Sequence, residues 1–271
     1  MTLRTWADLP DTLRTRIAER LAAVGSAEPV AGGFTPGVRV RMPVEGGRAA
    51  FVKAIPADDA LASMYRTEGA VNLTLPPRVG PRLLATLEAD GWVVLAFDHV
   101  EGRHPDLSPG GSDLPLVMTA VAALAAPLSP PPWPEAPEFA SHPVVDRATA
   151  QHRAMRGNTL LHCDIRSDNL LIGPEGVLFV DWALAHRGAA WLDAALLIPQ
   201  LIMAGHGPES AEAWAARVPA YASAPEGAVT AFAASLTGYW TDRLDQGVPA
   251  LRGYRRRAVG AGRAWQAFRE A

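Results

Sequence analysis

The sequence contains very little cysteine and no long apolar run. Cys163 is the single cysteine among 271 residues, which excludes an internal disulfide bond and a zinc site built from several thiolates. We therefore expect a protein of the reducing cytoplasm. The longest apolar stretch, residues 194–204, is interrupted by Pro199 and Gln200, whereas a membrane-spanning helix needs about 20 apolar residues. No transmembrane segment is expected.

Signals for secretion and for nucleic-acid binding are also missing. The first 22 residues carry Asp8, Asp11 and Glu19 and have no apolar core of the kind that a signal peptide requires. The formal net charge is −3, which gives no indication of nucleic-acid binding. Hydrophobic residues make up 49% and charged residues 20% of the chain, as is usual for a soluble protein with one large or two small domains.

Lysine is nearly absent. Of the 25 basic residues, 24 are arginine and one is Lys53. Lysine and arginine differ most where a compact point charge has to fit a tight place. The single lysine is therefore either a cation that the function requires or a residue that remains by chance in a composition that favours arginine.

The first hundred residues predict a strand-rich region with an internal helix. Helical spacing of apolar residues predicts a helix over residues 11–24. A glycine-rich stretch follows and leads into a hairpin, whose strands we expect near residues 38–41 and 49–55, with Lys53 on the return strand. A helix over residues 58–75 would end at two prolines, and two more strands are expected at 79–87 and 91–97.

After Gly102 the pattern becomes mainly helical. A helix is predicted over residues 114–126, a proline-rich loop over 128–137 and a further helix over 144–155. From residue 190 to the end the pattern is again helical.

The chemistry-bearing residues cluster between positions 160 and 181. His162, Asp164 and Asn169 form the pattern H-x-D-x-x-x-x-N, and a turn and a short apolar strand then lead to Asp181. Two short strands joined by this turn would bring Asn169 and Asp181 together as a metal clamp. Their oxygen atoms are hard ligands suited to Mg²⁺ on phosphates. Asp164 could orient a substrate hydroxyl, as phosphoryl transfer requires.

These residues resemble the aminoglycoside phosphotransferase family, which comprises antibiotic kinases and related small-molecule kinases with the kinase superfold. The matching segments lie in the family's order within about residues 30 to 200. They are Gly32-Gly33-Phe34-Thr35-Pro36-Gly37, Lys53, Glu68, His162-Cys163-Asp164 through Asn169, Val180-Asp181-Trp182 and Gly188 through Asp193. The resemblance implies an α+β, bilobal protein-kinase-like fold. Its strand-rich, nucleotide-binding lobe would cover residues 1–101 and its mostly helical, catalytic and substrate-binding lobe residues 102–271.

The resemblance also implies a role for each matching residue, with ATP and Mg²⁺ as cofactors. Lys53 would contact the α- and β-phosphates, while Glu68 holds the lysine through an ion pair. Asp164 would be the catalytic carboxylate, and Arg166 would reach the transferring phosphoryl group. The metal clamp would bind the magnesium ion. Further nucleotide contacts would come from the glycine-rich loop and from the connector after the last predicted strand, at Gly33, Thr35, Gly37, Phe97, Asp98, His99 and Val100.

Several neighbouring residues have a structural interpretation. Asp193 is expected to hydrogen-bond the catalytic loop, and His162 to brace that loop rather than to act as a base. Cys163 is expected to fill a small buried space, and Asp168 to be a solvated charge. The glycine-rich stretch departs from G-x-G-x-x-G and contains Pro36, so Thr35 would supply a hydroxyl in place of backbone donors.

The acceptor is expected to be a small molecule bearing a hydroxyl group, with no nucleic-acid or membrane partner. Eleven residues separate Asp181 from Asp193, which leaves no room for a peptide platform. An antibiotic such as an aminoglycoside or a nucleoside is favoured, and a metabolic kinase or a nucleotide-binding pseudokinase is the alternative. A cationic substrate would need acidic residues in the second lobe, whereas the C-terminal tail is basic, so neither charge of substrate is favoured. The acidic candidates are Glu135, Glu138, Glu209, Glu212, Asp242 and Asp245.

Overall fold

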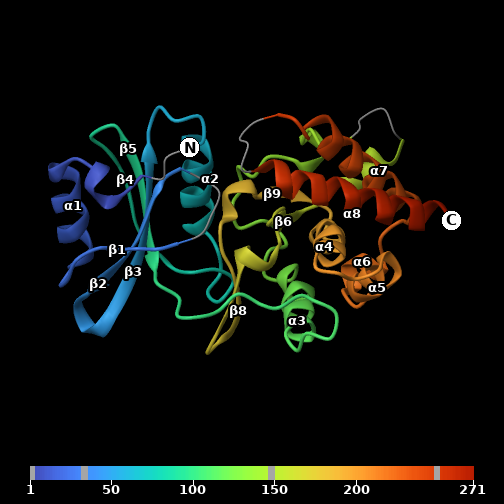
Figure 1. Ribbon diagram of the computed structural model, residues 1–271, viewed down its shortest axis with the longest axis horizontal. Helices are drawn as coiled ribbons and strands as arrows, with labels where there is room; N and C mark the ends of the chain where they lie inside the picture. Colours follow the sequence, from blue (N-terminus) through green and yellow to red (C-terminus); the bar gives the residue numbers. More distant parts are fainter. Residues whose placement is uncertain (1–3, 32–35, 146–149, 247–250) are drawn as a thin grey trace. The chain divides into compact units, whose positions relative to one another are not determined.

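The described chain separates into two structural units. The computed structural model describes residues 4–31, 36–145, 150–246 and 251–271 (Figure 1). The first unit comprises Met1–Arg103 together with Gly173–Leu184, and the second comprises His104–Ile172 together with Ala185–Ala271.

The first unit is built on a five-stranded antiparallel sheet with the strand order β1-β2-β3-β5-β4. Its strands are β1 (Glu28–Pro29), β2 (Val38–Val44), β3 (Arg48–Pro56), β4 (Leu83–Ala89) and β5 (Trp92–Asp98). Along β2, buried apolar residues alternate with partly exposed ones, because successive side chains point to opposite faces of a sheet. The predicted hairpin is therefore present, and both of its strands are longer than expected.

Two helices cover opposite faces of this sheet (Figure 1). The helix α1 (Asp11–Leu21) buries Leu13 and Ile17 against one face, in a cluster that includes Val94 of β5. The helix α2 (Ala62–Asn72) buries Tyr65 against the other face, where Leu95 belongs to the cluster. The alternation along β5 thus supplies both cores, and a short 3₁₀ helix, η1 (Trp6–Asp8), precedes α1.

The segment 173–184 belongs to the first unit, although the sequence prediction assigned it to the second lobe. It contains β8 (Gly176–Phe179) and the 3₁₀ helix η6 (Trp182–Leu184). The Phe179 N–H donates a hydrogen bond of 3.0 Å to the carbonyl of Val79. Trp182 is fully buried, and η6 contacts α2. Contacts between residues that are far apart in the sequence leave no periodic pattern, so the unit to which this segment belongs could not be predicted from the sequence.

The second unit is mainly helical. Its two-stranded sheet pairs β6 (Thr159–Leu161) with β9 (His186–Gly188) in antiparallel register. Strand β7 (Leu170–Gly173) ends at the boundary between the units. The α-helices are α3 (Leu114–Leu124), α4 (Leu192–Met203), α5 (Pro208–Ala215), α6 (Pro219–Ala222), α7 (Glu226–Asp242) and α8 (Arg252–Glu270). Helix α8 contacts α4, α5 and α7 and buries Trp265 completely.

The remaining helical turns are short and of the 3₁₀ type. They are η2 (Glu45–Gly47), η3 (Phe139–Ser141), η4 (Ala150–Met155) and η5 (Ser167–Asn169). The predicted helix over 144–155 is thus reduced to η4, apart from residues 146–149, which lie outside the described residues. Within the described chain, every helix is too short or too polar to cross a membrane. The α+β prediction is confirmed by the antiparallel sheet and the helical second unit.

Candidate functional site

Lys53 lies at the centre of a charged cluster in the first unit. It stands on β3, and its side chain is 11% exposed. Its ammonium group forms an ion pair with Glu68 of α2 and lies 3.3 Å from Oδ1 of Asp181. The Tyr65 ring lies beside it, with its centroid 5.0 Å from Nζ. The predicted pairing of Lys53 with Glu68 is present in the structure.

The two carboxylates stabilise the lysine but repel each other. Burial by itself lowers the pKa of Lys53, but Asp181 and Glu68 outweigh that effect, so the pKa is raised and the ammonium stays protonated. Burial, together with the Asp181 charge, raises the pKa of Glu68 to about 7, although the neighbouring lysine favours the carboxylate. Removing one partner would leave a buried charge without compensation.

Asp181 is held in a conformation that few residues other than glycine adopt. Its φ angle is 64°, in the left-handed region, and its side chain is 40% exposed. Strain of this kind costs of order 1–3 kcal/mol and persists where the surroundings fix the backbone. The carboxylate is therefore accessible and also tied to Lys53.

In the second unit, Asp193 holds the loop that begins at His162 through two backbone hydrogen bonds. It lies in the first turn of α4, and its carboxylate accepts the N–H groups of His162 and Cys163, each at 2.9 Å. Burial raises the pKa of Asp193 to about 6, although the two N–H donors act in the opposite direction. Cys163 adopts a left-handed φ of 65°, which these bonds stabilise. The expected structural role of Asp193 is confirmed by these bonds.

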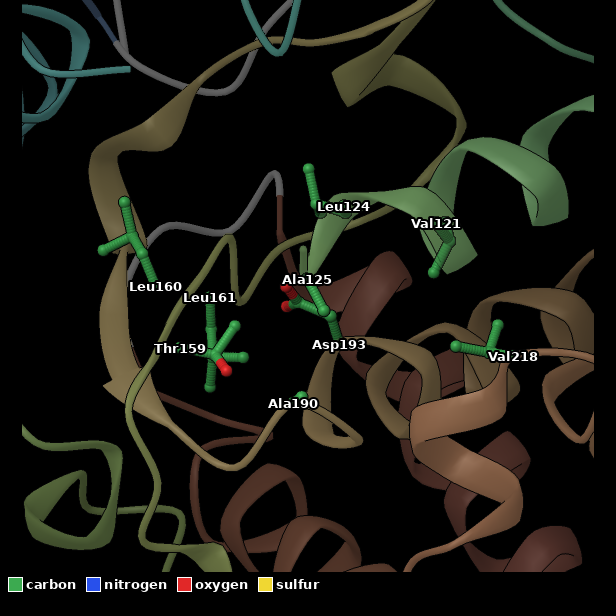
Figure 2. Close-up of a pocket in the computed structure, with 9 residues that line it drawn as sticks. All are labelled: Val121, Leu124, Ala125, Thr159, Leu160, Leu161, Ala190, Asp193 and Val218. Carbon is green, nitrogen blue, oxygen red and sulfur yellow. The ribbon is translucent and has the colours of Figure 1, made fainter. Parts of the chain in front are cut away.

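Asp193 also lines a small, mainly apolar cavity. Figure 2 shows the Asp193 carboxylate among small and aliphatic side chains from α3, β6 and the residue before α6, with Thr159 as a second polar neighbour. Its lining residues are Val121, Leu124, Ala125, Thr159, Leu160, Leu161, Ala190, Asp193 and Val218. With few polar groups around it, the buried carboxylate depends on its two backbone donors.

His162 is fully buried and braces the loop. Its Nδ1 accepts the N–H of Asp164 at 3.2 Å. A ring in this position is not exposed to a substrate, which fits the structural interpretation. Cys163 is partly buried, and desolvation raises the pKa of its thiol well above the ordinary value, which disfavours the reactive thiolate.

Asp164 and Asn169 are joined directly. The Asn169 side-chain amide donates from Nδ2 to the carbonyl of Asp164 at 2.9 Å and to its Oδ2 at 2.8 Å. This fixes the orientation of the amide and turns Oδ1, the atom that could bind a metal, away from Asp164. The Asn169 amide therefore orients the proposed catalytic carboxylate.

Arg166 lies between two carboxylates. Its Nε is 3.4 Å from Oδ2 of Asp164 and 3.1 Å from Oδ1 of Asp168. The guanidinium carbon is 5.7 Å from the centroid of the Tyr254 ring. Asp168 is 45% exposed, so it is a solvated charge, as expected, and it also pairs with Arg166.

The connector, which was predicted to offer backbone groups to adenine, begins inside the sheet. Phe97 is paired with β3 on one side and β4 on the other, and its side chain is buried. This residue therefore belongs to the sheet and offers no side-chain contact to a ligand. The Asp98 N–H donates to Arg82 O at 2.8 Å, and the His99 N–H donates to Ala49 O at 2.9 Å.

Val100 is the connector residue best placed to donate a backbone bond. Within the part of the chain that the structure describes, its N–H makes no hydrogen bond to another backbone group. The carboxylate of Asp98 pairs with Arg82 at 2.7 Å and Arg48 at 3.5 Å, and burial lowers the pKa of His99. The backbone from Asp98 to Val100 stays the predicted adenine contact.

The glycine-rich loop is described in part. Gly33 and Thr35 lie outside the described residues, so their roles stay predictions. At Gly37 an added Cβ would come within 2.2 Å of the Tyr65 hydroxyl and 2.6 Å of the Ala54 carbonyl oxygen. Glycine is therefore required at position 37 by close packing against α2 and β3.

Sequence reasoning missed three residues of these clusters. Tyr65 precedes Glu68 by one helical turn, and this i,i+3 spacing could have identified it as a neighbour of Lys53. Tyr254 of α8, which lies beside Arg166, and Gln200 of α4, which bonds the Tyr254 hydroxyl, belong to no motif that could have identified them. The two predicted metal ligands, Asn169 and Asp181, belong to different units, and the clamp stays a prediction.

Residues 113–227 match the model of the phosphotransferase enzyme family. The predicted family resemblance is confirmed. The segment of the chain that matches this phosphotransferase family contains the loop from His162 to Asn169 together with Asp181 and Asp193. A comparison with curated protein sequences finds no match.

Solved structures share the fold across nearly the whole chain. An amicoumacin kinase in complex with AMP-PNP, Ca²⁺ and Ami has a TM-score of 0.60 at 9% identity, covering 94% of each chain. The GDP complex of a variant of aminoglycoside 2'-phosphotransferase-IIIa has a TM-score of 0.59 at 14% identity, covering 96% of each chain. A protein assigned as a fructosamine-3-kinase from Thermobifida fusca has a TM-score of 0.58 at 17% identity, covering 96% of this chain and 100% of that one. These similarities confirm the kinase-like fold, and together with the family match they support a phosphotransferase.

Proposed function

We propose that the protein transfers the γ-phosphate of ATP to a hydroxyl group of a small molecule, with Mg²⁺ as the metal. The observation that carries the proposal is the cluster of Lys53, Glu68 and Asp181, in which the chain's single lysine is buried between two carboxylates. A buried cation beside an accessible carboxylate is suited to polyphosphate bound with a divalent metal. Related folds have been solved with AMP-PNP and Ca²⁺ and with GDP.

The donor set fits a magnesium ion. Asp181 supplies an accessible carboxylate, and Asn169 has an amide whose Oδ1 is oriented by the two Nδ2 bonds to Asp164. Mg²⁺ prefers such oxygen ligands, and in kinases phosphate oxygens and water molecules complete its coordination shell. Bound at this pair, the ion would neutralise charge on the transferring phosphoryl group. Lys53 would hold the α- and β-phosphates.

Asp164 would orient the acceptor hydroxyl and take its proton. Its carboxylate is fixed by Asn169 and lies near Arg166. General-base assistance of this type contributes about 10²–10⁴-fold to the rate. Arg166 would contribute positive charge close to the reacting groups, shared with its two carboxylate partners.

Two of the acidic residues considered for binding a cationic substrate have structural roles. Glu138 pairs with Arg187 at 2.8 Å. Glu212 is buried, pairs with Arg269 and accepts the Trp265 indole N–H at 2.9 Å. A strongly cationic acceptor would therefore depend on the other four, and the proposal is framed for hydroxyl-bearing acceptors of any charge. Antibiotics are the first class to test, since amicoumacin kinase and a kanamycin complex share the fold.

The test is a phosphate-transfer screen with ATP and GTP as donors and a panel of hydroxylated antibiotics and metabolites as acceptors. The matched variants are Asp164→Asn, which should abolish most transfer, and Glu175→Gln, which removes an exposed carboxylate outside the loop and should retain transfer. Binding of nucleotide without transfer to any acceptor would favour a pseudokinase. Because the single cysteine is free, we propose the reducing cytoplasm as the site of action.

A further inference from the structure

Helix α8 brings an aromatic residue to the catalytic loop from the far end of the sequence. Tyr254 lies in the first turn of α8, and its ring stands 5.7 Å from the guanidinium carbon of Arg166. Gln200 of α4 donates a hydrogen bond of 3.0 Å from Nε2 to the Tyr254 hydroxyl. All three residues belong to the second unit. They form a contiguous group, which we call the Tyr254 cluster.

Tyr254 is held by Gln200 and lies close to the charges of the loop. A phenol hydroxyl has one donor hydrogen and two acceptor positions. Here the oxygen accepts from Gln200, and both Arg166 and Asp164 act on the phenol. Burial raises the pKa of Tyr254, and the Asp164 charge raises it further, which places the phenol within electrostatic reach of that carboxylate.

Arg166 needs such support because it is attracted by two carboxylates at once. Its side chain is 13% exposed, and its Nε lies within 3.4 Å of Asp164 and 3.1 Å of Asp168. A planar guanidinium free to rotate would form a bidentate pair with one carboxylate. A pair of that kind with Asp164 would occupy the oxygen that should face the acceptor hydroxyl. The Tyr254 ring and hydroxyl restrict this rotation.

We propose that Tyr254 is a positioning residue of the acceptor side, which holds Arg166 so that the Asp164 carboxylate stays oriented toward the acceptor hydroxyl. Gln200 fixes the Tyr254 hydroxyl in turn. The inference rests on the proposed phosphotransferase function and assigns to α8 a part in the chemistry. It requires no contact between Tyr254 and the nucleotide.

The test compares Tyr254→Phe, which removes the hydroxyl and keeps the ring, with Tyr239→Phe. Tyr239 is a matched control, because its ring also carries an arginine, Arg243, at 3.8 Å, but on α7 and away from the catalytic loop. We expect Tyr254→Phe to lower kcat about tenfold while the Mg·ATP affinity and the Tm change little. Tyr239→Phe should leave kcat unchanged. The acceptor is the one identified by the screen, and water serves as acceptor in a parallel assay of ATP hydrolysis.

A double-mutant cycle decides whether Tyr254 acts through Arg166. In the Arg166→Ala background, Tyr254→Phe should have almost no further effect on kcat, because the group it orients is gone. An unchanged kcat in Tyr254→Phe, a loss that follows the Tm, or equal losses in both backgrounds would overturn the inference. If transfer occurs and depends on Asp164 while Tyr254→Phe is normal, only this inference fails. A wild-type protein without any turnover would overturn the proposed function and this inference with it.

Discussion

Lys53 shows how much of a site can depend on the type of one cation. The ammonium is small enough to lie between Glu68 and Asp181 and beside the Tyr65 ring. A guanidinium is larger, planar and fork-shaped, and it delivers its charge over several atoms. The chain uses arginine at every other basic position, so the lysine here reflects a steric and electrostatic requirement if the proposed site is correct.

We predict that Lys53→Arg impairs turnover nearly as much as Lys53→Ala. Both variants should lose about 10²-fold or more in kcat/KM, as expected for removal of a preorganised charge at a transition state. Arg66→Lys is the control, because Arg66 forms an exposed pair with Glu88 and exposed pairs contribute little. Circular dichroism should show an intact fold for all three. Near-normal activity in Lys53→Arg would mean that the lysine is not at the phosphates.

A second residue-scale prediction separates Asp164 from His162. Asp164→Asn should lower kcat by about 10²–10⁴-fold with almost unchanged ATP affinity, because Lys53 and Asp181 hold the nucleotide. His162→Ala removes a fully buried ring and the acceptor of the Asp164 N–H, so it should lower the Tm. Its activity should fall in step with the folded fraction. Normal turnover in Asp164→Asn would refute the proposed mechanism.

At the scale of elements, an aromatic cluster joins η3, β9 and α7 in the second unit. His142 follows η3 and stacks on Phe139 with centroids 5.6 Å apart; it meets His186 edge-on at 5.0 Å. Its Nδ1 accepts the N–H of Val144 at 3.1 Å. Burial, together with the charges of His186 and Arg243, lowers the pKa of His142 to about 4.

This cluster predicts a loss of stability in acid. A histidine whose pKa is depressed on folding stays neutral in the native state, while the unfolded chain takes up a proton below a pH of about 6.5. Stability contributed by His142 is therefore present above that pH and is lost as the pH falls toward 4. His142→Phe keeps an aromatic ring and cannot titrate, so its Tm should decline less than that of the wild type between pH 7 and 5. Parallel declines in thermal unfolding curves would contradict this assignment.

At the scale of the whole molecule, the proposed function predicts that ATP stabilises the protein in a metal-dependent way. A ligand that binds only the native state at 100 times its Kd adds about 2.7 kcal/mol to the free energy of unfolding. For a chain of this size that corresponds to several degrees in Tm. The shift should be larger with Mg²⁺ than with EDTA, and Asp181→Asn should reduce the difference, whereas Asp168→Asn should not. Equal shifts in Mg²⁺ and EDTA would argue against a metal at Asp181.

Local features were predictable because their causes are local. The hairpin of β2 and β3 follows from alternation around a glycine turn, and α2 follows from helical spacing that ends before two prolines. The loop motif followed from fixed spacing, and resemblance supplied the roles of its residues. The adenine contact expected of the connector stays a prediction, because the strands that pair with Phe97 on both sides come from other parts of the sequence.

The sequence by itself determined the alternation of strands and helices, the class of chemistry and the residues of the loop motif, since each depends on neighbours along the chain. The tertiary structure decided which residues contact each other. Packing of α8 against α4 and α7 brings Tyr254 to Arg166 and to the side chain of Gln200. A backbone bond to Val79 together with the burial of Trp182 assigns residues 173–184 to the first unit. Such contacts join residues that are far apart in sequence. They arise because buried apolar surface and backbone groups have to find partners across the fold, which no local pattern records.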